Sequence, residues 1–220
     1  MLIQAMISQS IPVLSMQDSI GNALQMMSDC HVSHLALADN EKYVGLVSEE
    51  LLLQAPDGSN RINSIQNNLS LISVQPGEHF LKALQIAVGK KISVVPVVDE
   101  DNQLVGVVSY HELLQKASEF MNVNEPGGLI VLEMESNNYS VGEISRLVET
   151  SNAQVVQLNT VVDSQTGLLL VTIKLNKEEI SEVVATLQRH EYCVKYYFGE
   201  ELYENELRFN YDNLMNYLKM

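Results

Sequence analysis

A serine followed three residues later by an acidic residue is the spacing in this sequence best suited to chemistry. It closes the stretch 104–112, where an apolar, β-branched run stops at Ser109 and Glu112 follows. The run predicts a buried strand, and the two polar residues predict a helix start with a capping box. A hydroxyl, backbone amides and a carboxylate at one point can also hold an anion that carries vicinal hydroxyls. A structural cap and a ligand site both fit these residues.

The same pattern occurs earlier, in the stretch 43–51, with one informative change. Ser48 keeps the capping position, but Leu51 stands where the later stretch has Glu112. A leucine side chain cannot accept a hydrogen bond. We therefore expect the earlier site to bind a nucleotide poorly, to bind a less polar part of a ligand, or to stay empty.

The two stretches belong to an internal repeat, which supplies the elements that must position them. Leu24 and Leu84 stand 60 positions apart, as do Asp39 and Asp99. Each copy predicts a short extended segment, an amphipathic helix, two strands and a final helix. A unit of about fifty residues buries little core alone. The copies should therefore pack together and leave clefts between them.

This tandem β-α-β-β-α plan and its Gly-x-x-Ser-x-x-acid phrase resemble the paired cystathionine-β-synthase (CBS) domain, or Bateman module, over residues 1–117. The resemblance implies that an adenosine-containing ligand (AMP, ADP, ATP or S-adenosylmethionine) binds between the copies. It also implies a regulatory role without catalysis, exerted on attached domains or on a partner protein whose identity is unknown. We expect no catalytic cofactor.

By this resemblance, Ser109 faces the phosphates of the ligand and Glu112 pairs with the ribose hydroxyls. The family usually has Asp at the second position, so the longer Glu would hold the ribose further out. The adenine would lie against five apolar residues, for which plain core is the alternative: Leu71, Ile72, Val94, Val95 and Pro96.

Other candidate ligand contacts come from the residues before the inner strand of each copy. Lys90 and Lys91 are a local positive charge in an acidic chain, suited either to phosphate contact or to a solvated surface. The matching positions in the first copy are Cys30 and His31. His34 and Ser48 would line the first cleft.

The segment 127–199 has a different plan, strand-helix-strand-strand-helix-strand, which predicts a ferredoxin-like fold. It resembles an ACT domain, the small amino-acid-sensing module, although the usual Asp-x-Pro-Gly turn is missing and only Gly142 is kept. Amino-acid binding therefore does not follow from the fold. A CBS pair followed by an ACT-like domain also resembles proteins of the acetoin-utilisation type.

We expect an α/β (α+β) chain with a CBS repeat at 1–55, a second at 61–120, an ACT-like domain at 127–199 and a C-terminal helix at 200–220. The last segment has one apolar stripe at helical spacing, formed by Tyr203, Leu207, Tyr211, Leu214 and Leu218. This stripe would pack on the chain's own body or on a second subunit. We expect a homodimer, because both module types tend to associate.

The charge balance argues against nucleic-acid and membrane partners. The chain has 13 Lys and Arg against 28 Asp and Glu, a formal charge of −15, which repels phosphate backbones and anionic lipids. There is no signal-peptide pattern and no apolar run of the roughly 20 residues that a membrane helix needs. We therefore expect a soluble, cytoplasmic protein.

Metal and catalytic sites are not predicted. Two cysteines form neither a disulfide framework nor a Cys-x-x-Cys pair, and His31 and His34 would point to opposite faces of a strand. His111 begins a zinc-protease-like phrase, but Gln115 occupies the position of the second histidine. No phosphate loop or nucleophile motif is present. The alternative to a sensor is a constitutive interaction module with degenerate clefts.

Overall fold

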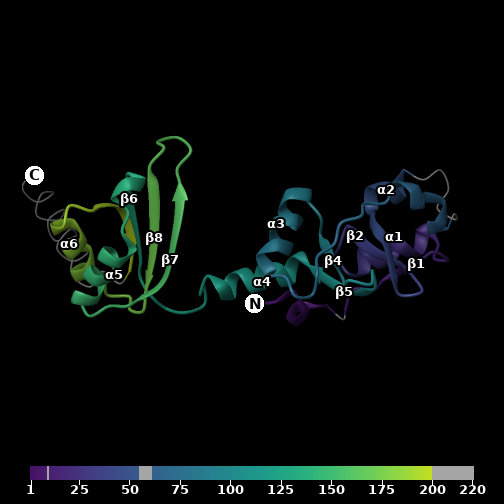
Figure 1. The fold of residues 1–220 in the computed structure, drawn as a ribbon, viewed down its shortest axis with the longest axis horizontal. Helices are drawn as coiled ribbons and strands as arrows, with labels where there is room; N and C mark the ends of the chain where they lie inside the picture. The colour runs from purple at the N-terminus through teal and green to yellow at the C-terminus, as the bar shows by residue number, and fades with distance from the viewer. Residues whose placement is uncertain (9, 55–60, 200–220) are drawn as a thin grey trace, which may run out of the picture. The chain divides into compact units, whose positions relative to one another are not determined.

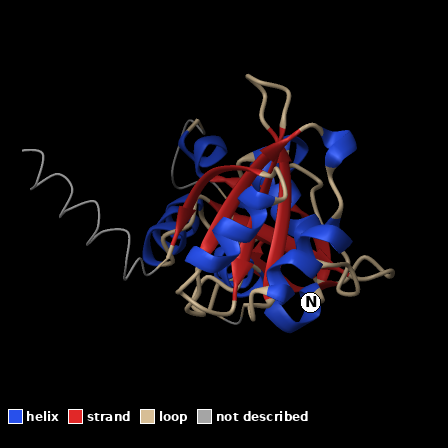
Figure 2. Cartoon of the chain, turned by 90° about the vertical axis from the view of Figure 1, so that its left-hand side faces the viewer, coloured by secondary structure: helices blue, strands red, loops and turns tan. Residues whose placement is uncertain are grey.

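The computed structural model describes residues 1–8, 10–54 and 61–199 of the chain, which forms two compact units, Met1–Ser118 and Glu119–Met220 (Figure 1). Helices and strands alternate in both units, which confirms the predicted mixed α/β (α+β) class (Figure 2). The predicted helix at 200–220 and most of the linker between the repeats lie outside the described residues.

The first unit contains the two copies of the repeat. The first copy comprises β1 (Leu14–Ser15), α1 (Ile20–Asp29), β2 (His34–Asp39), β3 (Lys42–Ser48) and α2 (Glu49–Leu53). The second comprises α3 (Phe80–Lys90), β4 (Val94–Val98), β5 (Leu104–Ser109) and α4 (Tyr110–Phe120). Short 3₁₀ helices, Ile3–Met6 and Ile62–Asn68, precede the copies. The extended segment expected at the start of the second copy forms only one parallel bridge, between Val74 and Val97.

The long helices of the two copies, α1 and α3, end in the same way. The hydroxyl of Ser19 accepts a hydrogen bond from the backbone N–H of Asn22 at 3.1 Å and caps α1. Residues at equivalent positions follow the two helices in the left-handed conformation, His31 with φ 53° and Lys91 with φ 54°. The apolar stripe of each helix is buried in the core of its own copy.

The segment that leads into each copy lies on the other copy. The backbone N–H of Ser8 donates to the carbonyl of Val107 at 2.8 Å, and Leu46 pairs with Ser70. A Cβ at Gly106 would lie 2.3 Å from Cγ2 of Ile7, too close for any residue except glycine. Each Gly-x-x-Ser strand is therefore covered by residues that belong, in sequence, to the opposite repeat.

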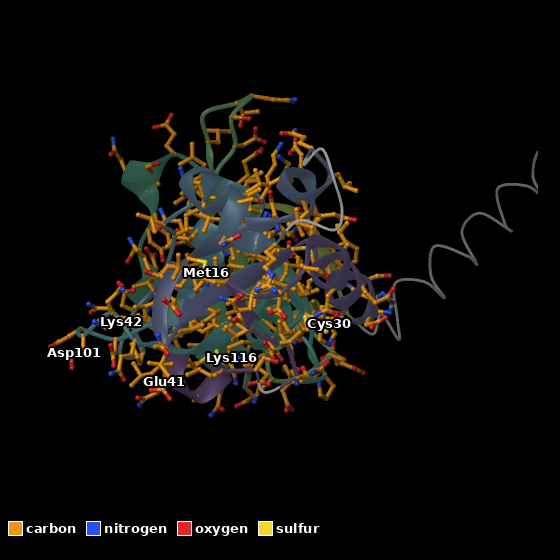
Figure 3. The ribbon with its side chains drawn as sticks, turned by 90° about the vertical axis from the view of Figure 1, so that its right-hand side faces the viewer. Met16, Cys30, Glu41, Lys42, Asp101 and Lys116 are labelled. Carbon is orange, nitrogen blue, oxygen red and sulfur yellow. The ribbon has the colours of Figure 1, made fainter. Side chains whose placement is uncertain are left out.

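The copies also join through a shared core and through their hairpin turns. Tyr43 is buried with residues of both copies, and its hydroxyl donates to the carbonyl of Ile72 at 2.7 Å. Burial raises the pKa of the Tyr43 phenol well above its usual value. At the turns, the N–H of Leu104 donates to the carbonyl of Glu41 at 2.8 Å, and Figure 3 shows Glu41 and Asp101 at the same end of the unit.

The second unit has the predicted ferredoxin-like order, with its elements in the sequence β6 (Leu129–Met134), α5 (Val141–Thr150), β7 (Val155–Val162), β8 (Leu169–Leu175), α6 (Ser181–Arg189) and β9 (Cys193–Phe198). The four strands pair antiparallel in the order β7-β8-β6-β9. Apolar residues of both helices and of the strands form one core. Among the described residues, no helix is long and apolar enough to cross a membrane.

Candidate functional site

A cavity of about 870 Å³ lies between the two copies and contains the Ser109 and Glu112 pair. We call it the Glu112 cleft. The second copy contributes residues 91–93 and 109–112 to its wall, and the first copy contributes residues 30–33. Ser10 and Ile11, from the segment that leads into the first copy, line it as well, together with the apolar residues Ala87, Val88 and Leu114 of the second copy. Its volume falls within the roughly 300–1,000 Å³ typical of small-molecule sites.

Ser109 and Glu112 form a reciprocal capping box at the start of α4. The Ser109 hydroxyl accepts from the N–H of Glu112 at 3.1 Å, and Oε2 of Glu112 accepts from the N–H of Ser109 at 2.7 Å. The same Oε2 accepts from the Ser109 hydroxyl at 2.8 Å. Among the described residues, Oε1 of Glu112 has no hydrogen-bond partner. The box therefore fixes the carboxylate at the cavity wall and uses only one of its two oxygens.

A second cavity, of about 600 Å³, contains the equivalent pair of the first copy. We call it the Leu51 cleft. Ser48 caps α2 by accepting from the N–H of Leu51 at 3.2 Å, and no acid closes the box. Glu49 and Glu50 line this cleft, together with Lys90 and Lys91. The Leu51 cleft is therefore lined by both negatively and positively charged side chains. In the larger cleft, Glu112 is the one acidic residue among those that line it.

The structure divides the predicted ligand contacts between the two clefts. Ser109, Glu112 and Lys91 line the Glu112 cleft. Four others line the Leu51 cleft: His34, Ser48, Ile72 and Lys90. Ile72 belongs to the second repeat in sequence, but its segment lies on the first copy, so it is not brought to Glu112.

The remaining predicted contacts line neither cleft. The side chain of Leu71 is 78% exposed. Val94, Val95 and Pro96 are buried within β4, where they pair with β5. The structure therefore places these three in the core, as the alternative interpretation of them expected, and keeps all four away from the carboxylate of Glu112.

A hydrogen-bonded group of three residues separates the clefts. Nδ1 of His34 accepts from the N–H of Ser93 at 3.3 Å and lies 3.1 Å from the hydroxyl of Ser33. The N–H of Ser33 donates to the hydroxyl of Ser93 at 3.0 Å. Because a backbone N–H can only donate, Nδ1 of His34 carries no proton here. Burial lowers the pKa of His34, and the nearby Glu49 partly opposes this shift.

Sequence reasoning missed several residues of the Glu112 cleft, among them Ser10, His31, Ser33 and Ser93. Ser33 and Ser93 occupy equivalent positions of the repeat, as do His31 and Lys91, so the repeat itself was a usable signal. Ser10 also has an equivalent, Ser70, which lines the Leu51 cleft, but the repeat does not show that each lead-in segment lies on the opposite copy. Within the described residues, no group of three or more His, Cys, Asp or Glu side chains is arranged to hold a metal ion.

Comparison with known proteins yields a family match over the repeat. A family model described as the CBS domain matches residues 3–58 and 66–119. Inosine-5'-monophosphate dehydrogenase of Bacillus subtilis is 25% identical over 170 residues, which is 74% of this chain and 34% of that protein. The chain spans about a third or less of the first curated relatives that it matches, 22% and 34% of their lengths.

The chain is also similar to solved structures. A CBS domain pair/ACT domain protein from Thermotoga maritima has a TM-score of 0.49 and 24% identity, covering 55% of this chain and 99% of that one. The CBSX2 protein in complex with AMP has a TM-score of 0.47 and 20% identity, covering 54% of this chain and 97% of that one.

Proposed function

This chain belongs to the CBS-domain family, and we propose that its paired repeats form a regulatory module that binds an adenosine-containing ligand in the Glu112 cleft. The candidate ligands are AMP, ADP, ATP and S-adenosylmethionine. The observation that carries the proposal is the Glu112 carboxylate, which is fixed at the wall of a cavity of about 870 Å³ and has one oxygen without a hydrogen-bond partner in the described part of the chain. We propose no reaction catalysed by this module.

In this proposal, Oε1 of Glu112 accepts hydrogen bonds from the ribose hydroxyls. An ionised carboxylate suits a vicinal diol, because it accepts hydrogen bonds and offers no donor that would compete. The capping box already holds the side chain in place, so little side-chain entropy is lost when the ligand binds.

The phosphate contact is assigned to Lys91. The Ser109 hydroxyl both donates to Oε2 and accepts from the N–H of Glu112, so the box occupies it. Lys91 lines the same cleft and carries a full positive charge on a flexible stem. A phosphorylated ligand is therefore favoured over S-adenosylmethionine, whose cationic sulfonium would face Lys91 rather than a second acid.

We propose that the signal passes from the repeats to the second unit, which we regard as an ACT-like domain, and from there to a partner protein. Its strand order supports this assignment. A ligand shifts a conformational equilibrium only by its difference in affinity between the two states. Residues of both copies line the Glu112 cleft, so a ligand that contacts both copies is suited to such a difference.

The direct test is thermal unfolding of the full chain with each of the four ligands, and with adenosine as the phosphate-free control. A ligand present at 100 times its dissociation constant stabilises the folded state by about 2.7 kcal/mol. We expect AMP, ADP or ATP to raise the unfolding temperature more than adenosine does. The proposal fails if none of these compounds raises it.

The second candidate, a constitutive interaction module with degenerate clefts, is favoured by two observations. Leu51 has replaced the acid in the first copy, and Glu112 already has structural partners in its box. This candidate predicts no stabilisation by any adenosine compound, and it predicts that Glu112→Gln changes only stability. The same ligand series therefore separates the two functions.

A further inference from the structure

The two clefts share part of one wall. Ser33, Lys91 and Ile92 line both the Glu112 cleft and the Leu51 cleft. Of these, Ile92 is apolar and Ser33 is neutral, so Lys91 is the charged residue that both clefts have in common. The shared wall raises the question of whether the two cavities can be filled independently.

Within the described residues, hydrogen bonds hold the backbone of Lys91 in place, whereas its ammonium forms no ion pair. Its N–H bonds to the carbonyls of Ala87 and Val88 at the end of α3, and its φ is 54°. Among the described residues, no carboxylate forms an ion pair with its ammonium. A long, flexible side chain on a fixed backbone can reach a ligand in either cleft.

The lysines are unequally divided between the clefts. Lys90 lines the Leu51 cleft but not the Glu112 cleft, and Lys91 is the only lysine or arginine that lines the Glu112 cleft among the described residues. The Leu51 cleft also contains Glu49 and Glu50, which oppose a phosphate. Lys91 is therefore the one cationic contact of the Glu112 cleft, and in the Leu51 cleft it acts with Lys90 to offset the two glutamates.

The remainder of the shared wall is a single hydrogen-bonded group. The hydroxyl of Ser33 lies 3.1 Å from Nδ1 of His34, which lines the Leu51 cleft, and 3.4 Å from the hydroxyl of Ser93, which lines the Glu112 cleft. A ligand that reorients one of these hydroxyls alters the hydrogen bonds presented to the other cleft.

We propose that Lys91 is one phosphate-binding cation shared by the two clefts, so that a phosphorylated ligand in either cleft weakens the binding of such a ligand in the other. This inference rests on the proposed function and specifies its regulation. Two phosphates beside one ammonium divide its attraction and repel each other, and both effects act in the same direction. The pair would then respond to a single phosphorylated ligand at a time.

The test is calorimetric titration of the full chain with AMP, comparing the wild type with Glu112→Gln. Glutamine can still complete the capping box, but it presents an amide donor to the ribose. In the wild type the first AMP binds in the Glu112 cleft and takes up Lys91, so the second AMP enters the Leu51 cleft without that contact. In Glu112→Gln the Glu112 cleft stays empty, so Lys91 is available to AMP in the Leu51 cleft. We expect AMP to bind the Leu51 cleft about tenfold more tightly in the variant than in the second step of the wild type, the effect of one charged hydrogen bond.

Three controls assign the binding steps to the clefts. Lys90→Ala should weaken the second step of the wild type and the single step of Glu112→Gln, because Lys90 lines only the Leu51 cleft. Adenosine, which has no phosphate, should bind the Leu51 cleft equally in both proteins. Adding Lys91→Ala to Glu112→Gln should remove the tenfold gain.

The outcomes separate this inference from the proposed function. A Leu51 cleft that binds AMP no more tightly in Glu112→Gln than in the second step of the wild type, or that binds no AMP in either protein, would overturn the sharing of Lys91 while leaving the nucleotide sensor in place. A wild type that binds no AMP in either cleft would overturn both. Binding of AMP to the Leu51 cleft that is detected only in Glu112→Gln would support the sharing.

Discussion

Oε2 of Glu112 accepts hydrogen bonds from both the backbone N–H and the hydroxyl of Ser109, at 2.7 and 2.8 Å. One side chain thus closes a helix cap and stands at the wall of the Glu112 cleft, which is larger than the Leu51 cleft. The cap and the ligand site, which the sequence presents as alternatives, are compatible because a carboxylate has two oxygens.

Substitution at Glu112 should separate these two roles. Glu112→Ala removes the box and should lower the free energy of unfolding by about 1 kcal/mol and remove the stabilisation that AMP gives by binding in the Glu112 cleft. Glu112→Gln should keep most of that stability and still lose this contribution of the Glu112 cleft. Urea unfolding with and without AMP measures both quantities. Ser48→Ala is the matched control: it removes the cap of the first copy and should leave the tighter AMP site intact.

Gly106→Ala should destabilise the first unit by about 2 kcal/mol or more, because the new methyl group would collide with Ile7. Gly89→Ala in α3 is the control: nothing lies within 4 Å of its Cβ position, and alanine should raise stability by about 0.5–1 kcal/mol. Denaturant unfolding measures both. The double variant Gly106→Ala with Ile7→Ala should lose less than the sum of the single losses, and strict additivity would contradict the contact.

Tyr43→Phe should cost about 1–2 kcal/mol, because it removes the hydroxyl that donates to the carbonyl of Ile72 at 2.7 Å. Tyr110, whose side chain is 44% exposed, provides a matched Tyr→Phe control that should change stability by less than about 0.5 kcal/mol. Thermal unfolding of the two variants is the measurement. Equal losses would show that the hydroxyl of Tyr43 does not link the copies.

Lowering the pH should destabilise the folded first unit, because His34 is neutral in the folded state and becomes protonated in acid. Its pKa is lower in the folded protein than the usual 6.5, so the unfolded chain binds a proton first as pH falls. The stability that depends on neutral His34 is complete above pH 6.5 and is lost as pH falls from there through the folded pKa. Glu49 faces the ring and opposes the loss, while Lys90 and Lys91 line the same cleft.

His34→Asn should flatten this pH dependence, because the Asn oxygen can accept from the N–H of Ser93 without titrating near neutral pH. Urea unfolding at pH 7.5 and pH 5.5 gives the difference for each protein. We expect the wild type to lose more stability than His34→Asn between these two values. Equal losses would place the titrating group elsewhere.

The sequence by itself determined the elements of this protein and their local endings. The repeat predicted two similar copies, the apolar periodicity predicted their helices, and the strand order of residues 129–198 followed the ferredoxin-like plan. The capping box of Ser109 and Glu112 was predictable because its partners are three residues apart. Contacts between residues three positions apart in a helix depend only on the residue types and their spacing.

Only the tertiary structure decided how the site is assembled. Ile7 meets Gly106 and Ser10 enters the Glu112 cleft, because each lead-in segment lies on the opposite copy. No local pattern encodes a contact across about a hundred residues, since it arises from the packing of two similar surfaces. The same exchange sends Ile72 to the Leu51 cleft and leaves Lys91 in the wall between the two.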